Sequence, residues 1–279
     1  MRTPPIQPSG RLPAVLATLV AALAAAFVLA PHPLAATRAT GGFSEVSTLR
    51  RTLRQTFAEY WSAGDRALTP GLQTVVDYWS RYHLAKAAIA SISLIVLVVL
   101  GVVLWKAFSR SGGLRAAVSA SAGALVTVLA LSSVVLVVAN IQGAVAPFAS
   151  LLPMLAVGND NGSSGGGRLG EALGQVRQEL AGSSVTGPLE VMISDFARYH
   201  AAVAVAGAVV VVVFAGLSVA SWRRLARTPR SDRRTRRVLG FHGILLAVSS
   251  LFMAVVAVAN TATAMDPAPA LLAFFEGGW

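Results

Sequence analysis

Four long, mainly apolar stretches dominate the hydropathy pattern of the chain, at residues 84–104, 116–139, 201–220 and 238–258. Each is long enough to cross a hydrocarbon core of roughly 30 Å, which takes about 20 residues at 1.5 Å each. Val, Ile and Leu fill these stretches without the two-residue alternation of a barrel strand, so we predict helices. The pattern therefore predicts an all-α integral membrane protein with a four-helix transmembrane core.

A fifth apolar stretch, residues 12–30, lies near the N-terminus. Arg2 and Arg11 precede an alanine-rich centre, and small residues follow it, which is typical of a secretory signal peptide cleaved after Ala36 or Ala39. The apolar part is long for such a peptide, so an uncleaved anchor is the alternative. We therefore interpret residues 1–39 as a signal peptide or a first transmembrane helix.

Between the spans, apolar residues recur at helical spacing. The first such stripe comprises Val46, Leu49, Leu53, Phe57, Tyr60 and Trp61, and the second comprises Leu169, Leu173, Val176 and Leu180. Each predicts an amphipathic helix of about four turns. The breakers Thr69-Pro70-Gly71 and Thr186-Gly187-Pro188 follow, and each opens a new stripe that leads directly into the next span. We expect each of these later helices to run unbroken into the membrane.

The chain also matches itself at an offset of 117 residues. Residues 69–133 align without a gap with residues 186–250, which places Arg81-Tyr82-His83 on Arg198-Tyr199-His200 and Gly123 on Gly240. After a shift of three, Asn140 falls on Asn260. Because each copy crosses the membrane twice, we predict two parallel-duplicated hairpins related by a pseudo-two-fold axis along the membrane normal.

These features divide the chain into segments that follow the N-terminal residues 1–39. Residues 40–157 form the first repeat unit, with extracytoplasmic helices followed by spans 84–104 and 116–139. Residues 158–167 are a flexible Gly/Ser linker, and residues 168–279 form the second unit, with spans 201–220 and 238–258.

The charge distribution predicts the orientation. Only 13% of the residues are charged, and the net charge of +11 lies in short blocks between the apolar stretches. The connection 222–237 carries eight arginines and one aspartate, and the connection after residue 104 carries Lys106, Arg110 and Arg115. Both connections should face the cytoplasm by the positive-inside rule, with the long segments and the C-terminus outside. A nucleic-acid or anionic-lipid patch is the alternative reading of the arginines; we predict no nucleic-acid partner.

Composition bears on the source and on the chemistry. The 21 arginines against two lysines, together with abundant Ala, Val and Gly, are typical of a GC-rich bacterial genome. We therefore expect a multi-pass protein of the bacterial cytoplasmic membrane. The absence of cysteine from the chain excludes a disulfide framework and a thiolate nucleophile or metal ligand.

The sharpest candidate site is the matched pair His83 and His200, each predicted at the outer membrane surface. Two imidazoles at equal depth could hold a haem or share a metal if their helices were neighbours. Arg81-Tyr82 and Arg198-Tyr199, which precede them, are however typical of an interfacial anchor, and we favour that interpretation. A proton-sensitive or partner-contacting role is a further alternative.

The remaining polar positions in the spans favour packing roles. Asn140 and Asn260 close the outer ends of their spans, where amides cap a helix or bond across helices; lining a shared polar pocket is the alternative. His242 lies about one turn inside the cytoplasmic end of its span, and its counterpart in the first unit is Leu125. We expect a nearby backbone or serine group to form a hydrogen bond with its imidazole. We identify no catalytic residue and no metal site by spacing.

We therefore expect a non-enzymatic membrane binding or scaffold protein, or an accessory subunit, that presents a small helical outside domain to a membrane or cell-envelope protein. A small-solute or ion pathway formed by a homo-oligomer is one alternative, because four helices rarely enclose a route alone. A haem-linked electron carrier using His83 and His200 is the other; without that haem we expect no cofactor.

Overall fold

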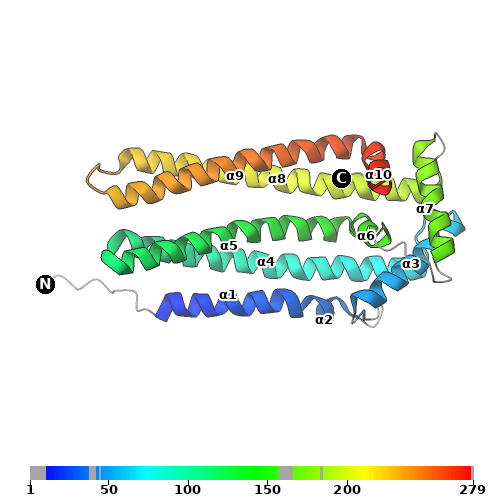
Figure 1. Cartoon of the computed structure of the whole chain (residues 1–279), viewed down its shortest axis with the longest axis horizontal. Coiled ribbons are helices and arrows are strands. Elements are labelled where there is room, and N and C mark those ends of the chain that lie inside the picture. The colour runs from blue at the N-terminus through cyan, green and yellow to red at the C-terminus, as the bar shows by residue number, and fades with distance from the viewer. Residues whose placement is uncertain (1–10, 38–41, 44, 157–165, 183–184, 278–279) are drawn as a thin grey trace. The chain divides into compact units, whose positions relative to one another are not determined.

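A computed structural model describes residues 11–37, 42–43, 45–156, 166–182 and 185–277 (Figure 1). The described part of the chain folds into helices connected by short turns. In chain order the helices are α1 (Arg11–Leu29), α2 (Pro31–Ala35), α3 (Val46–Ala63), α4 (Pro70–Arg110), α5 (Gly113–Val145), α6 (Pro147–Ala156), α7 (Gly166–Ala181), α8 (Gly187–Arg227), α9 (Arg233–Met265) and α10 (Pro267–Phe275). The predicted cleavage site after Ala39 and most of the predicted linker 158–167 lie outside the described residues, whereas Ala36 is described.

Five helices, α1, α4, α5, α8 and α9, are long and apolar enough to cross a membrane. They contain the four predicted spans and all but the last residue of the N-terminal apolar stretch, so the prediction of an all-α membrane protein is confirmed. Helices α4 and α8 have 41 residues each and run unbroken, as expected from the sequence. At 1.5 Å per residue each is about 60 Å long, which is about twice the thickness of a hydrocarbon core.

The turn between α8 and α9 is held by side-chain caps. Arg236 Nη1 donates to the carbonyl oxygens of Leu225 and Thr228, at 2.9 Å each, and so ties the start of α9 to the end of α8. Asp232 Oδ1 accepts the Thr235 N–H at the start of α9. Hydrogen bonding from the Thr235 side chain, and then from its backbone N–H, lowers the pKa of the Asp232 carboxyl. In the shorter turn between α4 and α5, Gly113 has a φ of 56°, which glycine adopts without strain.

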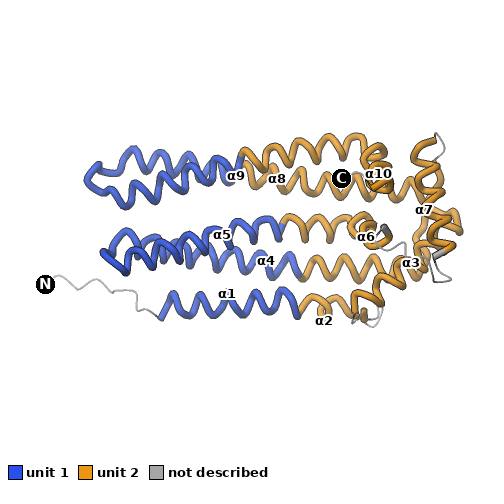
Figure 2. The backbone as a smooth tube through the Cα atoms, in the orientation of Figure 1, with its two compact units in different colours: residues 1–29, 86–137, 212–250 blue, residues 30–85, 138–211, 251–279 orange. Residues whose placement is uncertain are grey.

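The chain divides into two compact units (Figure 2). Unit 1 comprises residues 1–29, 86–137 and 212–250, and unit 2 comprises residues 30–85, 138–211 and 251–279. Unit 2 contains the larger core, in which the apolar faces of α3, α6, α7 and α10 pack with the first turns of α4 and α8. Its most deeply buried large side chains include Phe57, Tyr60, Tyr78, Leu151, Leu189, Met192 and Leu271. The two predicted amphipathic stripes therefore belong to one core, apart from Val46, which is exposed.

Unit 1 has few buried side chains and many exposed apolar ones. Its small core consists of Leu97, Leu100 and Val126, against which Leu16 and Val20 of α1 pack. Large aliphatic side chains remain accessible around it, for example Ile95 at 64% and Val212 at 71%. A soluble surface rarely exposes such a continuous apolar area, whereas a surface that faces lipid does.

Helices α4 and α8 start 117 residues apart and also end 117 residues apart, whereas α5 and α9 are offset by 120 residues at both ends. The extra three residues lie in the connection between the two helices of each pair, residues 111–112 in one and 228–232 in the other. The helix ends therefore favour a match of Gly123 with Gly243 over the predicted match with Gly240. A Cβ on Gly123 would lie 3.0 Å from the Trp105 ring and one on Gly243 would lie 3.0 Å from the Trp222 ring, whereas a Cβ on Gly240 would meet no atom within 4 Å.

Candidate functional site

His83 lies on α4 and is hydrogen-bonded to the next helix. Its Nδ1 is 3.0 Å from Oδ1 of Asn140 on α5. Since an amide oxygen only accepts, Nδ1 carries the proton and donates it. The two residues that the sequence suggested as separate features thus join the two helices of one hairpin.

The second hairpin repeats this arrangement. His200 Nδ1 on α8 is 2.7 Å from Asn260 Oδ1 on α9. The Asn260 Nδ2 group donates to the carbonyl oxygen of Val256 at 2.8 Å, which fixes the amide oxygen toward the histidine. We call these two interactions, His83–Asn140 and His200–Asn260, the hairpin clasps.

The rings that surround the two clasps differ. His83 packs edge-on against Trp79, with ring centroids 4.8 Å apart, and next to Tyr82. Gly143 of α5 lies directly against the His83 ring, because a Cβ on this glycine would stand 2.7 Å from its atoms. His200 packs instead against Phe196, at 4.6 Å, and Tyr199.

Tyr82, which precedes His83, contacts other protein side chains. Tyr82 stacks on Trp79 at 5.0 Å with the planes 4° from parallel, and its ring lies 4.8 Å from His32. Arg81 is exposed. These contacts are compatible with the predicted anchor, and they add a packing role that the sequence did not indicate.

Arg198 is exposed and pairs with a buried carboxylate, that of Asp195. Its Nη1 is 3.0 Å from Asp195 Oδ1, and the second oxygen of Asp195 accepts the backbone N–H of Ala149 at 2.9 Å. Asp195 is only 7% exposed and stands at the first turn of α6, where backbone N–H groups lack helical partners. A carboxylate of α8 therefore caps a helix that follows the other hairpin. The sequence analysis missed this role because an aspartate eight residues after a helix start shows no local capping pattern.

His242 on α9 donates from Nδ1 to the carbonyl oxygen of Val238, at 2.9 Å, as the structural interpretation predicted. Its ring packs edge-on against Trp105 of α4, with centroids 5.1 Å apart. Trp105 Nε1 donates in turn to Thr127 Oγ1 at 3.2 Å. In the described part of the chain, no group of three or more His, Asp or Glu side chains is arranged to hold a metal ion.

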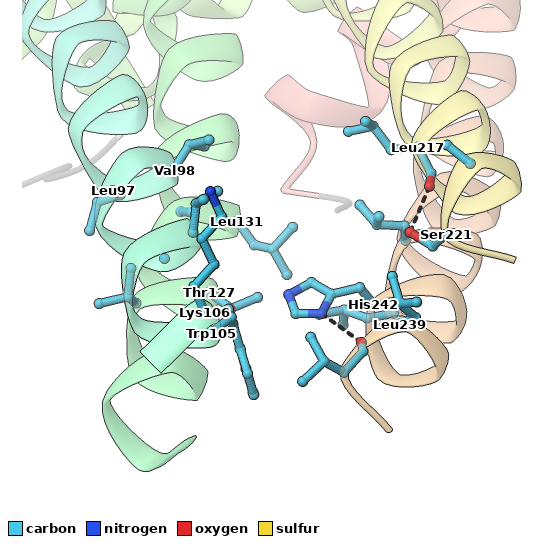
Figure 3. Close-up of a pocket in the computed structure, with 18 of the residues that line it drawn as sticks. Leu97, Val98, Trp105, Lys106, Thr127, Leu131, Leu217, Ser221, Leu239 and His242 are labelled. Atoms are coloured by element: carbon cyan, nitrogen blue, oxygen red, sulfur yellow. Dashed lines mark hydrogen bonds between the residues drawn. The ribbon is translucent and has the colours of Figure 1, made fainter. Parts of the chain in front are cut away.

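Beside His242 lies a cavity of about 640 Å³ within unit 1. Side chains from α4 and α5 line one side of it and side chains from α8 and α9 line the other (Figure 3). Its lining is apolar along most of its length and includes the cations Lys106, Arg110 and Arg224. Sequence reasoning assigned these cations to membrane topology alone. The sequence signal that could have indicated a basic cavity was the position of these cations at the ends of two neighbouring spans.

No protein-family model, curated protein or solved structure matches the chain.

Proposed function

We propose that the protein is a membrane-anchored scaffold whose outer helical domain binds a protein partner of the bacterial cell envelope. The observation that carries the proposal is the buried core of unit 2, which is built mainly from residues outside the four predicted spans. A core of this size gives the connecting segments a fixed shape, which loops that only joined spans would not need.

The proposed orientation follows the arginine asymmetry. Residues 107–115 and 223–237 face the cytoplasm, and α3, α6, α7 and α10 lie outside. Reporter fusions at Gly113, Gly166 and Trp279 should score inside, outside and outside. A reversed score at any of these positions would reject the orientation.

We also infer that the two hairpins are copies of one ancestral unit. Matched helix lengths support this, as do the paired clasps and the Gly123–Trp105 and Gly243–Trp222 contacts. The spacing from Pro70 to His83 equals that from Gly187 to His200, which would place the two histidines at equal depth. Cysteines introduced at these positions should show equal accessibility to a membrane-impermeant maleimide, and unequal accessibility would contradict the duplication.

Contacts after α1 support the uncleaved anchor over the signal peptide. Tyr78 Oη donates to the Phe43 carbonyl oxygen at 3.1 Å and lies 2.8 Å from His32 Nδ1, and Ala35 is fully buried in the same core. Cleavage after Ala36 or Ala39 would remove His32 and Ala35 from this core. Intact-mass measurement of the membrane protein should include residues 1–39; a mature chain starting near Thr37 or Thr40 would contradict retention.

The exposed face of α7 is the best-supported contact surface for the partner. Gly170 and Gly174 lie on it with no atom within 4 Å of the position of an added Cβ. Glycine inside a helix costs about 1 kcal/mol relative to alanine, and it allows another backbone to come close.

The test is the double substitution Gly170→Ala and Gly174→Ala in the full-length protein. It should raise the thermal unfolding midpoint, since two glycines leave an exposed helix, and reduce recovery of the partner from native membranes in mild detergent. Gly216→Ala is the matched control, because a Cβ there also meets open space, and it should leave partner recovery unchanged. Unchanged recovery with the double variant would reject α7 as the contact surface.

The same purified sample separates the scaffold from its rivals. A haem carrier would show a Soret band that disappears in His83→Ala or His200→Ala. A solute or ion pathway would show flux in vesicles without any partner. Either result, in the absence of a co-purifying envelope protein, would replace the proposed function.

A further inference from the structure

The cavity of unit 1 has two chemically different ends. Toward the middle of the spans its lining is aliphatic, including Leu97, Val98 and Leu131. Toward the connections it includes Lys106, Arg110 and Arg224. The cavity is therefore amphipathic along the helix axes, with a charged end and an apolar wall.

Its length matches one membrane leaflet. Along α4 the lining extends from Leu94 to Arg110, a rise of about 24 Å. Half of a bilayer measures about 20–22 Å including the headgroup region. The cavity thus runs from headgroup depth to the middle of the bilayer.

Its charge has one sign. The lining contains no aspartate or glutamate. Among the residues that the structure describes, the ion pairs are Arg66–Glu190 and Arg198–Asp195, and neither involves Lys106, Arg110 or Arg224. Three cations beside an apolar wall complement a ligand that carries a phosphate and a hydrocarbon chain.

We propose that this cavity binds a phospholipid with an anionic headgroup. Its phosphate lies between Lys106, Arg110 and Arg224, and an acyl chain lies along the aliphatic wall. Basic pockets between transmembrane helices on the cytoplasmic side bind such headgroups. A volume of about 640 Å³ is within the range of pockets that bury ligands, and it holds the headgroup and part of one chain. The lipid comes from the cytoplasmic leaflet under the orientation proposed above.

Trp105 supplies a local probe, because it lines the cavity. The full-length protein in mild detergent is titrated with phosphatidylglycerol or phosphatidylcholine carrying the same brominated acyl chains, which quench tryptophan fluorescence on contact. Phosphatidylglycerol should bind at least about tenfold more tightly. The quenching should fall sharply in Trp105→Phe. Equal affinity for both lipids, or quenching unchanged in Trp105→Phe, would overturn the proposal.

The charge requirement has a matched control. The triple variant Lys106→Gln, Arg110→Gln and Arg224→Gln should lower the affinity for phosphatidylglycerol to that for phosphatidylcholine. Arg227→Gln, Arg230→Gln and Arg233→Gln remove the same charge from residues that do not line the cavity, and should change the affinity less than about twofold. Equal losses in both triple variants would mean general attraction to a basic surface, which overturns the site.

The apolar wall is tested separately. Leu131→Trp fills the wall without changing the charge, and should weaken phosphatidylglycerol binding while far-ultraviolet circular dichroism stays unchanged. Glycerol 3-phosphate, which lacks acyl chains, should compete poorly. Competition as strong as that of the whole lipid would show a small-anion site and overturn the proposal. None of these outcomes depends on the envelope partner, so the site and the proposed function fail independently.

Discussion

The two hairpins share their clasps and differ in what surrounds them. In the first, His83 is packed between the Trp79 ring and Gly143, so the helices approach closely. In the second, Thr263 stands where Gly143 would align at the offset of 120 residues, and His200 packs against the smaller ring of Phe196. The hydrogen bond is thus the common feature, and the packing around it belongs to each hairpin alone.

The outer helices α3 and α7 also differ, because the first contributes aromatic side chains to the core and the second aliphatic ones. Helix α3 carries Phe57, Tyr60 and Trp61 into the core, whereas α7 contributes Leu169, Leu173 and Val176. A hydrogen bond from Trp61 Nε1 to Gln175 Oε1, at 2.8 Å, joins the two helices. Aromatic side chains bury about 150–250 Å² each, so the first outer helix supplies the larger share of the core surface.

The largest expected effect tests the close approach in the first hairpin. Gly143→Leu places a side chain where the His83 ring already stands, so the helices must separate. Overpacking of this kind costs about 1–3 kcal/mol, and the clasp would be lost in addition. Thermal unfolding in mild detergent should show a much lower midpoint for Gly143→Leu than for Thr263→Leu. Equal decreases would show that the two hairpins are packed alike.

The next effect tests the buried charge that distinguishes the second hairpin. Asp195→Ala removes the cap of α6 and leaves Arg198 without its carboxylate. Loss of a helix cap costs about 0.5–2 kcal/mol. Tyr78→Phe, at the corresponding position in α4, removes the hydroxyl contacts with Phe43 and His32, at about 1 kcal/mol. The effect of both variants is measured as protease protection of the outer domain. Unchanged protection in Asp195→Ala would contradict the capping role.

A smaller effect tests what the hairpins share. Double-mutant cycles with His83→Ala and Asn140→Ala, and with His200→Ala and Asn260→Ala, isolate each clasp from its surroundings. Side-chain hydrogen bonds in membranes contribute about 0.6 kcal/mol on average, so both coupling energies should be near this value. The single change His83→Ala should still cost more than His200→Ala, because it also empties the space beside Gly143. Coupling in only one hairpin would contradict the common clasp.

Much of the fold could be predicted from periodicity. The spans, the unbroken helices from Pro70 and Gly187, and the amphipathic stripes all follow from local patterns. Helices α6 and α10 were missed, since short helices that begin at Pro147 and Pro267 carry no periodic stripe long enough to recognise. Their burial depends on contacts with distant segments.

The candidate residues were found, but their pairing was not. His83, His200, Asn140 and Asn260 stood out as repeated polar positions, and sequence cannot show that each imidazole bonds within its own hairpin. Asp195 and the cavity cations were missed for the same reason, because their roles arise only where helices meet. Sequence alone leaves the position of the three-residue shift open, because Val- and Ala-rich spans align at several offsets, and the helix ends favour the connection between the two helices of each pair.

The smallest effect at neutral pH tests the aromatic contribution of α3, which α7 lacks. Burial raises the pKa of the Tyr60 hydroxyl from 10.0 to about 12. Because the folded pKa lies above the unfolded value, the neutral phenol contributes stability that is complete below pH 10 and is lost as the pH rises toward 12. Tyr60→Phe gives up only a long hydrogen bond to the Arg66 carbonyl, at 3.4 Å, so it should change little at pH 7. The unfolding midpoint of the wild-type protein should then fall more steeply than that of Tyr60→Phe between about pH 10 and 12. Parallel pH profiles for the two proteins would show that Tyr60 is not held neutral by the core.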